Sequence, residues 1–300
     1  MPGKVRIGIS GWTYKPWRGV FYPSGLPHRR ELQFAASLFN SVEINGTFYG
    51  LQRPSSFARW ADETPAGFVF SIKGSRYITH MLKLRNIELA MANFLASGPL
   101  RLGARLGPLL WQFPPQFRFH PEVFEAFLQM LPTTMEAAAR LARLHDARLA
   151  GRAFVESGPE PHRPLRHAVE IRNHTFVNSA FTSLLRRYNV ALVCADAVEW
   201  PLLMDTTADF VYCRLHGSEQ LYVSGYEEDA LNTWAQRVCS WATGIGHVEG
   251  LYADPSRTTN DGRERDVYVY FDNDAKVRAP FDAQGLIARV DRLLASPSRI

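Results

Sequence analysis

Ala168-Val169-Glu170-Ile171-Arg172, near the middle of the chain, is the stretch that decides the fold. It has the pattern of a short buried β-strand whose last residues are charged. Side chains two positions apart on a strand share a face, so we expect Glu170 and Arg172 to point the same way. Ionisable groups are rarely buried unless they are paired. A charged end on an apolar strand therefore predicts a pocket at that end.

The same pattern, an apolar run followed by polar or charged residues, occurs seven more times along the chain. The eight predicted strands are residues 5–10, 41–45, 68–73, 106–113, 167–172, 190–196, 210–217 and 267–271. Segments with helical periodicity separate them, except that 197–208 is too short for a full helix. Strands that alternate with helices run parallel and are joined by crossovers. Eight such units in 300 residues predict one (β/α)8 TIM barrel.

The main alternative to the barrel is an open, doubly wound sheet. Such a sheet would carry a glycine-rich phosphate loop after its first strand, and Gly8-Ile9-Ser10-Gly11 does not match that motif. Residues 133–165, between the fourth and fifth strands, are longer than one crossover needs. We interpret them as a partly helical insertion on a single domain that spans residues 1–300.

The composition is that of an ordinary globular protein, with 46% hydrophobic and 21% charged residues. There is no apolar run long enough for a transmembrane helix, and the N-terminus lacks the apolar region of a signal peptide. Three cysteines without a CxxC pair argue against a disulfide framework. We therefore expect a cytoplasmic protein with no membrane partner. The net charge of +5 is compatible with an anionic ligand.

The C-terminal ends of parallel barrel strands form the functional face of this fold, and polar residues gather at those ends. We predict catalytic roles for Glu43, Lys73, Glu170 and His216. We predict substrate-binding roles for Trp12, Asn45, Gln112, Arg172, Asp196, Arg214, Asn273 and Asp274. The strand order further predicts that neighbouring ends pair, Lys73 with Glu43 and Arg214 with Asp196. The structural alternative is an ion-pair lattice that fills the barrel.

A pocket of mixed charge suits a polar or anionic small molecule, such as a sugar or a phosphorylated compound. Arg172 and Arg214 can grip a carboxylate or phosphate bidentately. Glu43 or Glu170 can act as general acid or base, and the imidazole of His216 can move a proton or donate a hydrogen bond. Lys73 can hold an anion or, if its pKa is lowered, form a Schiff base. The aromatic loop that contains Trp12 offers flat faces for a ring, or else packs as a lid.

Two other functions remain open from the sequence. A metal-dependent hydrolase, phosphodiesterase or isomerase would use Glu43, Glu170, Asp196 and His216 to bind Mg²⁺, Mn²⁺ or Zn²⁺. The balancing cations make a metal the less favoured reading, and no other cofactor is indicated. A non-catalytic module would bind nucleic acid or protein through the arginine-rich residues 140–166. Acidic residues interrupt that segment, which favours a solvated helix and loop.

Several of these stretches together resemble one family. They are Ile9-Ser10-Gly11-Trp12, Val42-Glu43-Ile44-Asn45, Glu170-Ile171-Arg172, Arg214-Leu215-His216-Gly217 and the end of the eighth strand. As a set they are similar to the YecE-like family, catalogued as domain of unknown function 72, over about residues 5–294. The resemblance implies a TIM barrel and brings no established reaction. Asn173 replaces an expected basic residue and Asp272 an expected asparagine, so substrate details are expected to differ.

Overall fold

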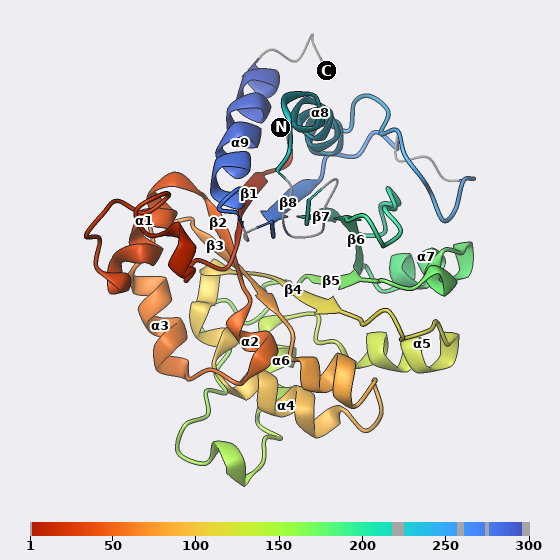
Figure 1. Ribbon diagram of the computed structural model, residues 1–300. Coiled ribbons are helices and arrows are strands. Elements are labelled where there is room, and N and C mark those ends of the chain that lie inside the picture. Colours follow the sequence, from red (N-terminus) through yellow and green to blue (C-terminus); the bar gives the residue numbers. More distant parts are fainter. Residues whose placement is uncertain (1, 218–224, 257–260, 274–275, 296–300) are drawn as a thin grey trace.

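The computed structural model describes residues 2–217, 225–256, 261–273 and 276–295. Its parallel strands form a closed barrel in chain order, with β1 also paired to β8 (Figure 1). The strands are β1 Val5–Ser10, β2 Ser41–Ile44, β3 Val69–Lys73, β4 Leu106–Gln112, β5 His167–Glu170, β6 Ala191–Asp196, β7 Phe210–Leu215 and β8 Asp266–Phe271. This confirms the predicted (β/α)8 barrel.

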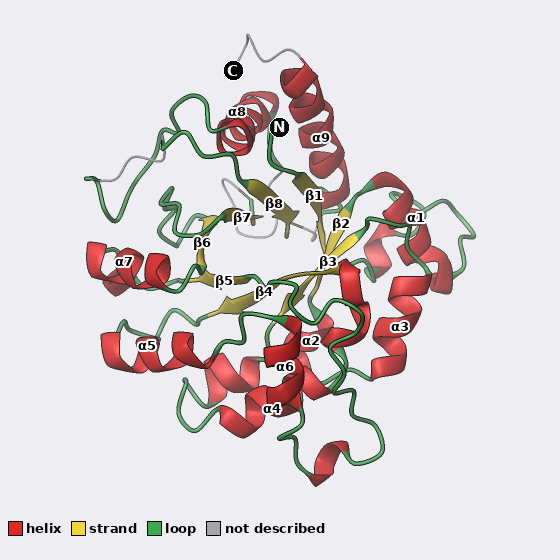
Figure 2. Cartoon of the chain, turned by 180° about the vertical axis from the view of Figure 1, so that it is seen from behind, coloured by secondary structure: helices red, strands yellow, loops and turns green. Residues whose placement is uncertain are grey.

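Helices surround the barrel, as Figures 1 and 2 show from opposite sides. They are α1 Glu31–Leu38, α2 Gly46–Tyr49, α3 Pro54–Asp62, α4 Glu88–Ala96, α5 Pro121–Met130, α6 Met135–Ala142, α7 Ser179–Arg187, α8 Glu228–Thr243 and α9 Ala279–Ala295. Residues 197–209, all of them described, join β6 to β7 without a helix, as predicted. None of the described helices is long and apolar enough to cross a membrane.

Local sequence explains where the helices begin and which face they bury. Asn178 caps α7 because its Oδ1 accepts a hydrogen bond from the Phe181 amide at 2.9 Å. Phe181, Leu184 and Leu185 then recur at helical spacing and are buried against the barrel. This helix thus covers the outside of the barrel with one apolar face, while Ser183 and Arg187 on its other face are exposed.

The predicted insertion contains α6 and a short 3₁₀ turn over Ala147–Leu149. It lies against α4, because the Asp146 amide donates to Asn93 Oδ1 at 3.1 Å and the Phe154 amide donates to the Ala96 carbonyl at 2.8 Å. Among the elements that the sequence pattern did not indicate are the short helix α2 and a π-helical turn, Tyr77–Met81.

The interior of the barrel is a packed core. Leu110, Ala168 and Val193 point inward together with Tyr212 and Tyr270. Both phenol hydroxyls find partners inside the barrel: Tyr212 bonds Ser71 Oγ and Tyr270 bonds Ser41 Oγ, each at 2.6 Å. Small alanines and large tyrosines pack together in this cluster, as expected for the filled interior of a barrel of this fold. The polar residues at the C-terminal ends of the strands lie directly above this core.

Candidate functional site

Arg214, near the end of β7, is fully buried and binds three carboxylates from three other strands or strand ends. Its Nη1 lies 2.6 Å from Glu170 Oε2, and its Nη2 lies 2.9 Å from Glu43 Oε1 and 2.7 Å from Asp272 Oδ2. Burial alone would raise the pKa of Glu170, but Arg214 and Arg172 outweigh it and hold this pKa well below its usual range. Glu170 is therefore ionised throughout the physiological range.

Neutral donors complete the pairing of Glu43. The Tyr212 hydroxyl donates to Glu43 Oε2 at 2.6 Å, and Ser10 Oγ donates to Glu43 Oε1. Asn45 Nδ2 in turn donates to Ser10 Oγ at 2.9 Å. Burial, followed by the nearby charge of Glu43, raises the pKa of Tyr212 well above its usual range, so the phenol stays a donor. Glu43 is thus surrounded by donors that fix it in place.

The structure corrects the predicted positions of Asp196 and Asn273. Ala195, not Asp196, shares its register position with Arg214, so Asp196 faces the helices outside the barrel. Its carboxylate accepts a hydrogen bond from Trp234 Nε1 of α8 at 2.9 Å. The predicted pair of Asp196 with Arg214 is therefore wrong. Asn273 likewise donates to Asp282 of α9 at 2.8 Å.

Asp272, the residue after β8, is the third carboxylate bound to Arg214. It follows β8 on the face that also carries Tyr268 and Tyr270, which are both in the barrel interior. Burial opposes its ionisation, but Arg214 and a hydrogen bond with His216 keep the pKa of Asp272 well below its usual range. Asp274, also predicted to bind substrate, lies outside the described residues.

Arg172 lies just beyond β5 and forms, with Trp200 and His216, an upper tier of the site above the ion pairs of Arg214. Its Nε and Nη2 lie 2.9 Å and 2.8 Å from Glu170 Oε1, while Arg214 holds the other oxygen of that carboxylate. The guanidinium carbon stacks 3.5 Å from the ring centroid of Trp200. The Trp200 ring meets the His216 ring edge-on at 5.0 Å. His216 Nδ1 is 3.1 Å from Asp272 Oδ2, which ties this tier to the cluster below.

Lys73 ends β3 at the same C-terminal end of the barrel, which we call the mouth. Unlike Arg172 and Arg214, it has no carboxylate partner among the described residues. Within the described parts of the chain, its Nζ makes no hydrogen bond or ion pair, so the predicted pair with Glu43 does not form. Its contact is the ring of Phe48, whose centroid lies 4.5 Å away. Burial, followed by repulsion from Arg214, lowers the pKa of Lys73 to about 8. A sizeable neutral fraction therefore exists near neutral pH.

His80 is a member of the site that the sequence analysis did not include. It lies on the π-helical turn after β3, with Nδ1 2.8 Å from Thr79 Oγ1 and Nε2 3.4 Å from Gln112 Nε2. Burial, followed by the positive charges of Arg172 and Lys73, lowers the pKa of His80 to about 4. The imidazole is therefore neutral at neutral pH. π-Helical turns often occur at functional sites, and this one brings a histidine to the mouth.

A small cavity of about 260 Å³ lies beside the mouth and is lined by Trp12, Asn45 and Trp60, among others. Trp12 and Trp60 meet edge-on at 5.4 Å. The Oδ1 atom of Asn45 is buried, and no described residue donates a hydrogen bond to it. The other large aromatics of this loop, such as Trp17 and Tyr22, are buried in the core. Most of the loop therefore packs in the core beside α1 and α9, and Trp12 remains at the cavity.

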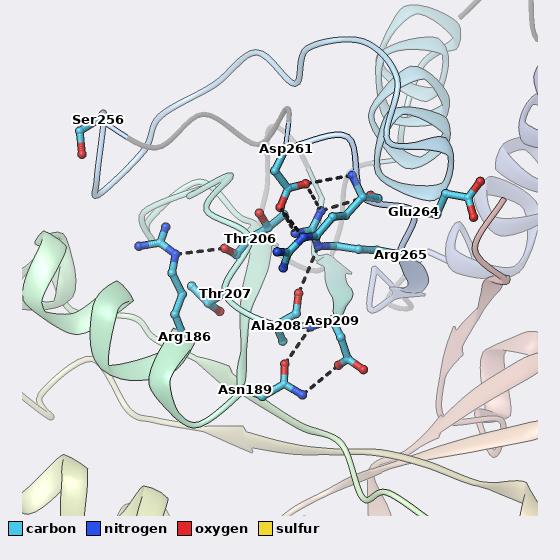
Figure 3. A pocket seen from close by; sticks show the side chains of 11 residues that line it. Arg186, Asn189, Thr206, Thr207, Ala208, Asp209, Ser256, Asp261, Glu264 and Arg265 are labelled. Atoms are coloured by element: carbon cyan, nitrogen blue, oxygen red, sulfur yellow. Dashed lines mark hydrogen bonds and ion pairs between the residues drawn. The ribbon is translucent and has the colours of Figure 1, made fainter. Parts of the chain in front are cut away.

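A larger cavity of about 710 Å³ lies at the opposite end of the barrel (Figure 3). Its lining residues precede β6, β7 and β8, so it opens at the N-terminal ends of the strands. Figure 3 shows Asn189 bonded to Asp209 and Arg265 bonded to Asp261, at 3.1 Å and 2.6 Å. Active sites of this fold lie at the C-terminal end, so the mouth remains the candidate site.

Comparison with known proteins identifies the family. The family model described as protein of unknown function DUF72 matches residues 6–299. This chain belongs to the DUF72 family. It is 28% identical to the UPF0759 protein YecE of Escherichia coli K12 over 143 residues, which is 40% of this chain and 50% of YecE. It is also 28% identical to the UPF0759 protein YunF of Bacillus subtilis over 118 residues, which is 38% of this chain and 41% of YunF.

These matches span about half the length of the curated relatives or less. Solved DUF72 structures cover far more of the chain. TM1631 of Thermotoga maritima aligns with a TM-score of 0.72 and 24% identity over 96% of this chain and 99% of its own. EF0366 of Enterococcus faecalis aligns with a TM-score of 0.65 and 16% identity over 96% and 95%. At these identities the likeness shows the shared barrel fold.

The geometry also bears on the two alternative functions of this DUF72 chain. Arg214 lies between Glu43 and Glu170, and Asp196 faces away, so the four predicted metal ligands do not form one set. In the described ranges no three His, Cys, Asp or Glu residues are arranged to hold a metal ion. In the basic segment, Arg163 bonds backbone carbonyls and Arg166 bonds Asp266 at 2.6 Å. Those two arginines stabilise the fold.

Proposed function

We propose that this DUF72 protein is an enzyme that acts on a polar or anionic small molecule at the C-terminal mouth of its barrel. The observation that carries the proposal is the state of Lys73. It is buried beside a charge cluster, yet no described carboxylate pairs with it. A buried cation without a partner is costly for folding, which favours a role in binding or chemistry over a role in stability.

The ion pairs of Arg214 with Glu43, Glu170 and Asp272 support this proposal because these side chains already bond one another. Arg214 uses both terminal nitrogens on Glu43, Glu170 and Asp272, and none of these carboxylates forms an ion pair with Lys73, although their charges partly oppose the lowering of its pKa. Arg172 shares Glu170 and keeps 11% of its side chain exposed. The formal charges of Arg214 and its three carboxylates sum to −2, and Lys73 and Arg172 balance them. An anionic group that enters the mouth would meet these two cations.

The pKa shifts of Glu170, Lys73 and His80 also indicate which of these residues can act as acid or base. Glu170 is held in its ionised form by two arginines, so it is a poor general acid and a weak base. Lys73, with a pKa of about 8, can give or take a proton near neutral pH. His80 is neutral there and can donate or accept a hydrogen bond. We therefore assign proton transfer to Lys73 rather than to Glu43 or Glu170.

The cavity beside the mouth supports a ligand with polar groups as well as an anion. Asn45 Oδ1 has no donor among the described residues, and a ligand hydroxyl would supply one. Trp12 offers a partly exposed aromatic ring at the same cavity. A phosphorylated or carboxylated sugar-like compound combines these features.

Calorimetric titration with inorganic phosphate, malonate and glucose 6-phosphate tests the binding half of the proposal. We expect at least one to bind the unmodified chain and to bind Lys73→Met at least tenfold more weakly. Lys15→Met, which changes an exposed lysine, is the matched control. NMR of sugar phosphates and oxo acids incubated with the protein tests turnover. Binding that is unchanged in Lys73→Met, or no substrate consumed by the unmodified chain, would overturn the proposal.

A further inference from the structure

Lysine is rare in this chain, and the position of Lys73 sets it apart. The chain has five lysines, and Lys4, Lys15, Lys83 and Lys276 are all exposed. Lys73 keeps only 8% of its surface accessible. The other cations of the mouth are arginines, which cannot be deprotonated in proteins. The site therefore contains one primary amine, and an amine can form a covalent bond to carbon that a guanidinium cannot.

The surroundings of Lys73 match the conditions that activate a lysine as a nucleophile. These conditions are desolvation beside an apolar wall and the presence of a second cation. The ring of Phe48, 4.5 Å from Nζ, is the apolar wall. Arg214 is the second cation, and its repulsion adds to burial in lowering the pKa of Lys73 to about 8. No described hydrogen-bond acceptor occupies the amine, so its lone pair is available in the neutral form.

We propose that Lys73 forms an imine with the carbonyl carbon of an aldehyde or ketone substrate that also carries an anionic group. This inference rests on the proposed function, because it uses the same mouth and the same anion-binding charges. It adds a substrate class and a covalent step. Arg172, stacked on Trp200, would hold the anionic group while the carbonyl carbon lies next to Nζ.

The step balances without any redox partner. The neutral Nζ attacks the carbonyl carbon, a C–N bond forms, and the carbonyl oxygen becomes the hydroxyl of a carbinolamine. The hydroxyl then leaves as water with the protons that Nζ gives up, and a C=N bond forms. Overall, the ammonium form of Lys73 and one carbonyl compound yield one iminium ion and one water. Atoms and the single positive charge are conserved.

Reductive trapping of the full chain tests the inference. The chain is incubated at pH 7 with glyoxylate, a small anionic aldehyde, and with sodium cyanoborohydride, which reduces an imine to a stable secondary amine. Peptide mass spectrometry then measures carboxymethylation at each lysine. Because a pKa of about 8 leaves roughly a tenth of the amine neutral at pH 7, against less than about a thousandth for an ordinary lysine, we expect Lys73 to react at least tenfold faster than Lys15.

Three controls make the outcome specific. The preference for Lys73 should vanish in denaturant, and the rate at Lys73 should level off above about pH 8 while that at Lys15 keeps rising. Acetaldehyde, which lacks the carboxylate, should label Lys73 more slowly than glyoxylate does. Equal rates with both aldehydes would overturn the anionic substrate class.

Labelling of Lys73 no faster than that of Lys15 would overturn the imine step. If glyoxylate still stabilised the unmodified chain but not Lys73→Met against heat, the proposed anion-binding mouth would stand without the imine. If glyoxylate neither labelled Lys73 nor stabilised the chain, and none of the three calorimetric probes bound, both proposals would fall.

Discussion

Replacing Lys73 by methionine should make the protein more stable at neutral pH. Burial, followed by repulsion from Arg214, lowers the pKa of Lys73 from 10.5 to about 8, so the folded state disfavours the charged form. One pKa unit corresponds to about 1.4 kcal/mol, so a shift of this size costs roughly 3 kcal/mol of folding free energy at pH 7. Methionine fills a similar volume, carries no charge and suits the contact with Phe48. We expect Lys73→Met to recover most of that cost.

The pH dependence gives this prediction its sign. Between pH 8 and 10.5 the unfolded wild-type chain binds the proton of Lys73 more tightly than the folded chain does, so wild-type stability rises with pH there. The advantage of Lys73→Met is therefore complete below about pH 8 and lost as the pH approaches 10.5. Urea denaturation followed by circular dichroism at pH 7, 9 and 10.5 measures it.

Lys15→Met is the control for that measurement, since an exposed lysine should change stability by no more than about 0.5 kcal/mol. A Lys73→Met variant less stable than the wild type at pH 7 would refute the reasoning. So would a stability gain that is the same at pH 7 and at pH 10.5, because the gain would then owe nothing to the charge of Lys73.

Three further substitutions test the rest of the site. Arg214→Met should cost roughly 3–5 kcal/mol or prevent folding, because it leaves buried carboxylates unpaired; thermal melts should show less than about 1 kcal/mol for the exposed Arg187→Met. Glu170→Gln should destabilise the chain at pH 7 and lose this effect progressively as the pH falls from the unfolded-state value of about 4.5 toward the much lower folded-state pKa, because the stabilisation from a lowered carboxyl pKa is complete only above the unfolded-state value; a cost that is as large in urea titrations at pH 3 as at pH 7 would contradict this. Asp196→Asn should leave the binding of phosphate probes unchanged in calorimetry, since Asp196 faces Trp234, and weakened binding would count against that placement.

The fold was predictable because it depends on patterns that repeat along the chain. Each strand is an apolar run, and most are followed by a helix with one apolar face, so the alternation itself indicates parallel strands and crossovers. The inward positions of Glu43 and Arg214 also followed from their place at strand ends. Periodicity places a residue on a face, and the structure agrees for both.

The pairing within the site was not predictable, because it crosses the barrel. Arg214 on β7 binds carboxylates from β2, from β5 and from the residue after β8, whereas strand order suggested its neighbour on β6. Asp196 and Asn273 were misplaced for a simpler reason: an error of one position moves a strand side chain to the opposite face. His80 lies on a π-helical turn, which follows neither the strand nor the helix period.

The sequence was compatible with two interpretations of the charged residues: an ion-pair lattice that fills the barrel, and a site that binds a ligand. In the structure the two are connected, because the ion pairs of Arg214 influence the charge state of Lys73. Three carboxylates near Lys73 would by themselves favour its charged form. Arg214 binds all three and adds its own repulsion, which is second only to burial among the effects that lower the pKa of Lys73. The lattice therefore occupies the end of the barrel and at the same time helps to keep the pKa of Lys73 low in the mouth above it.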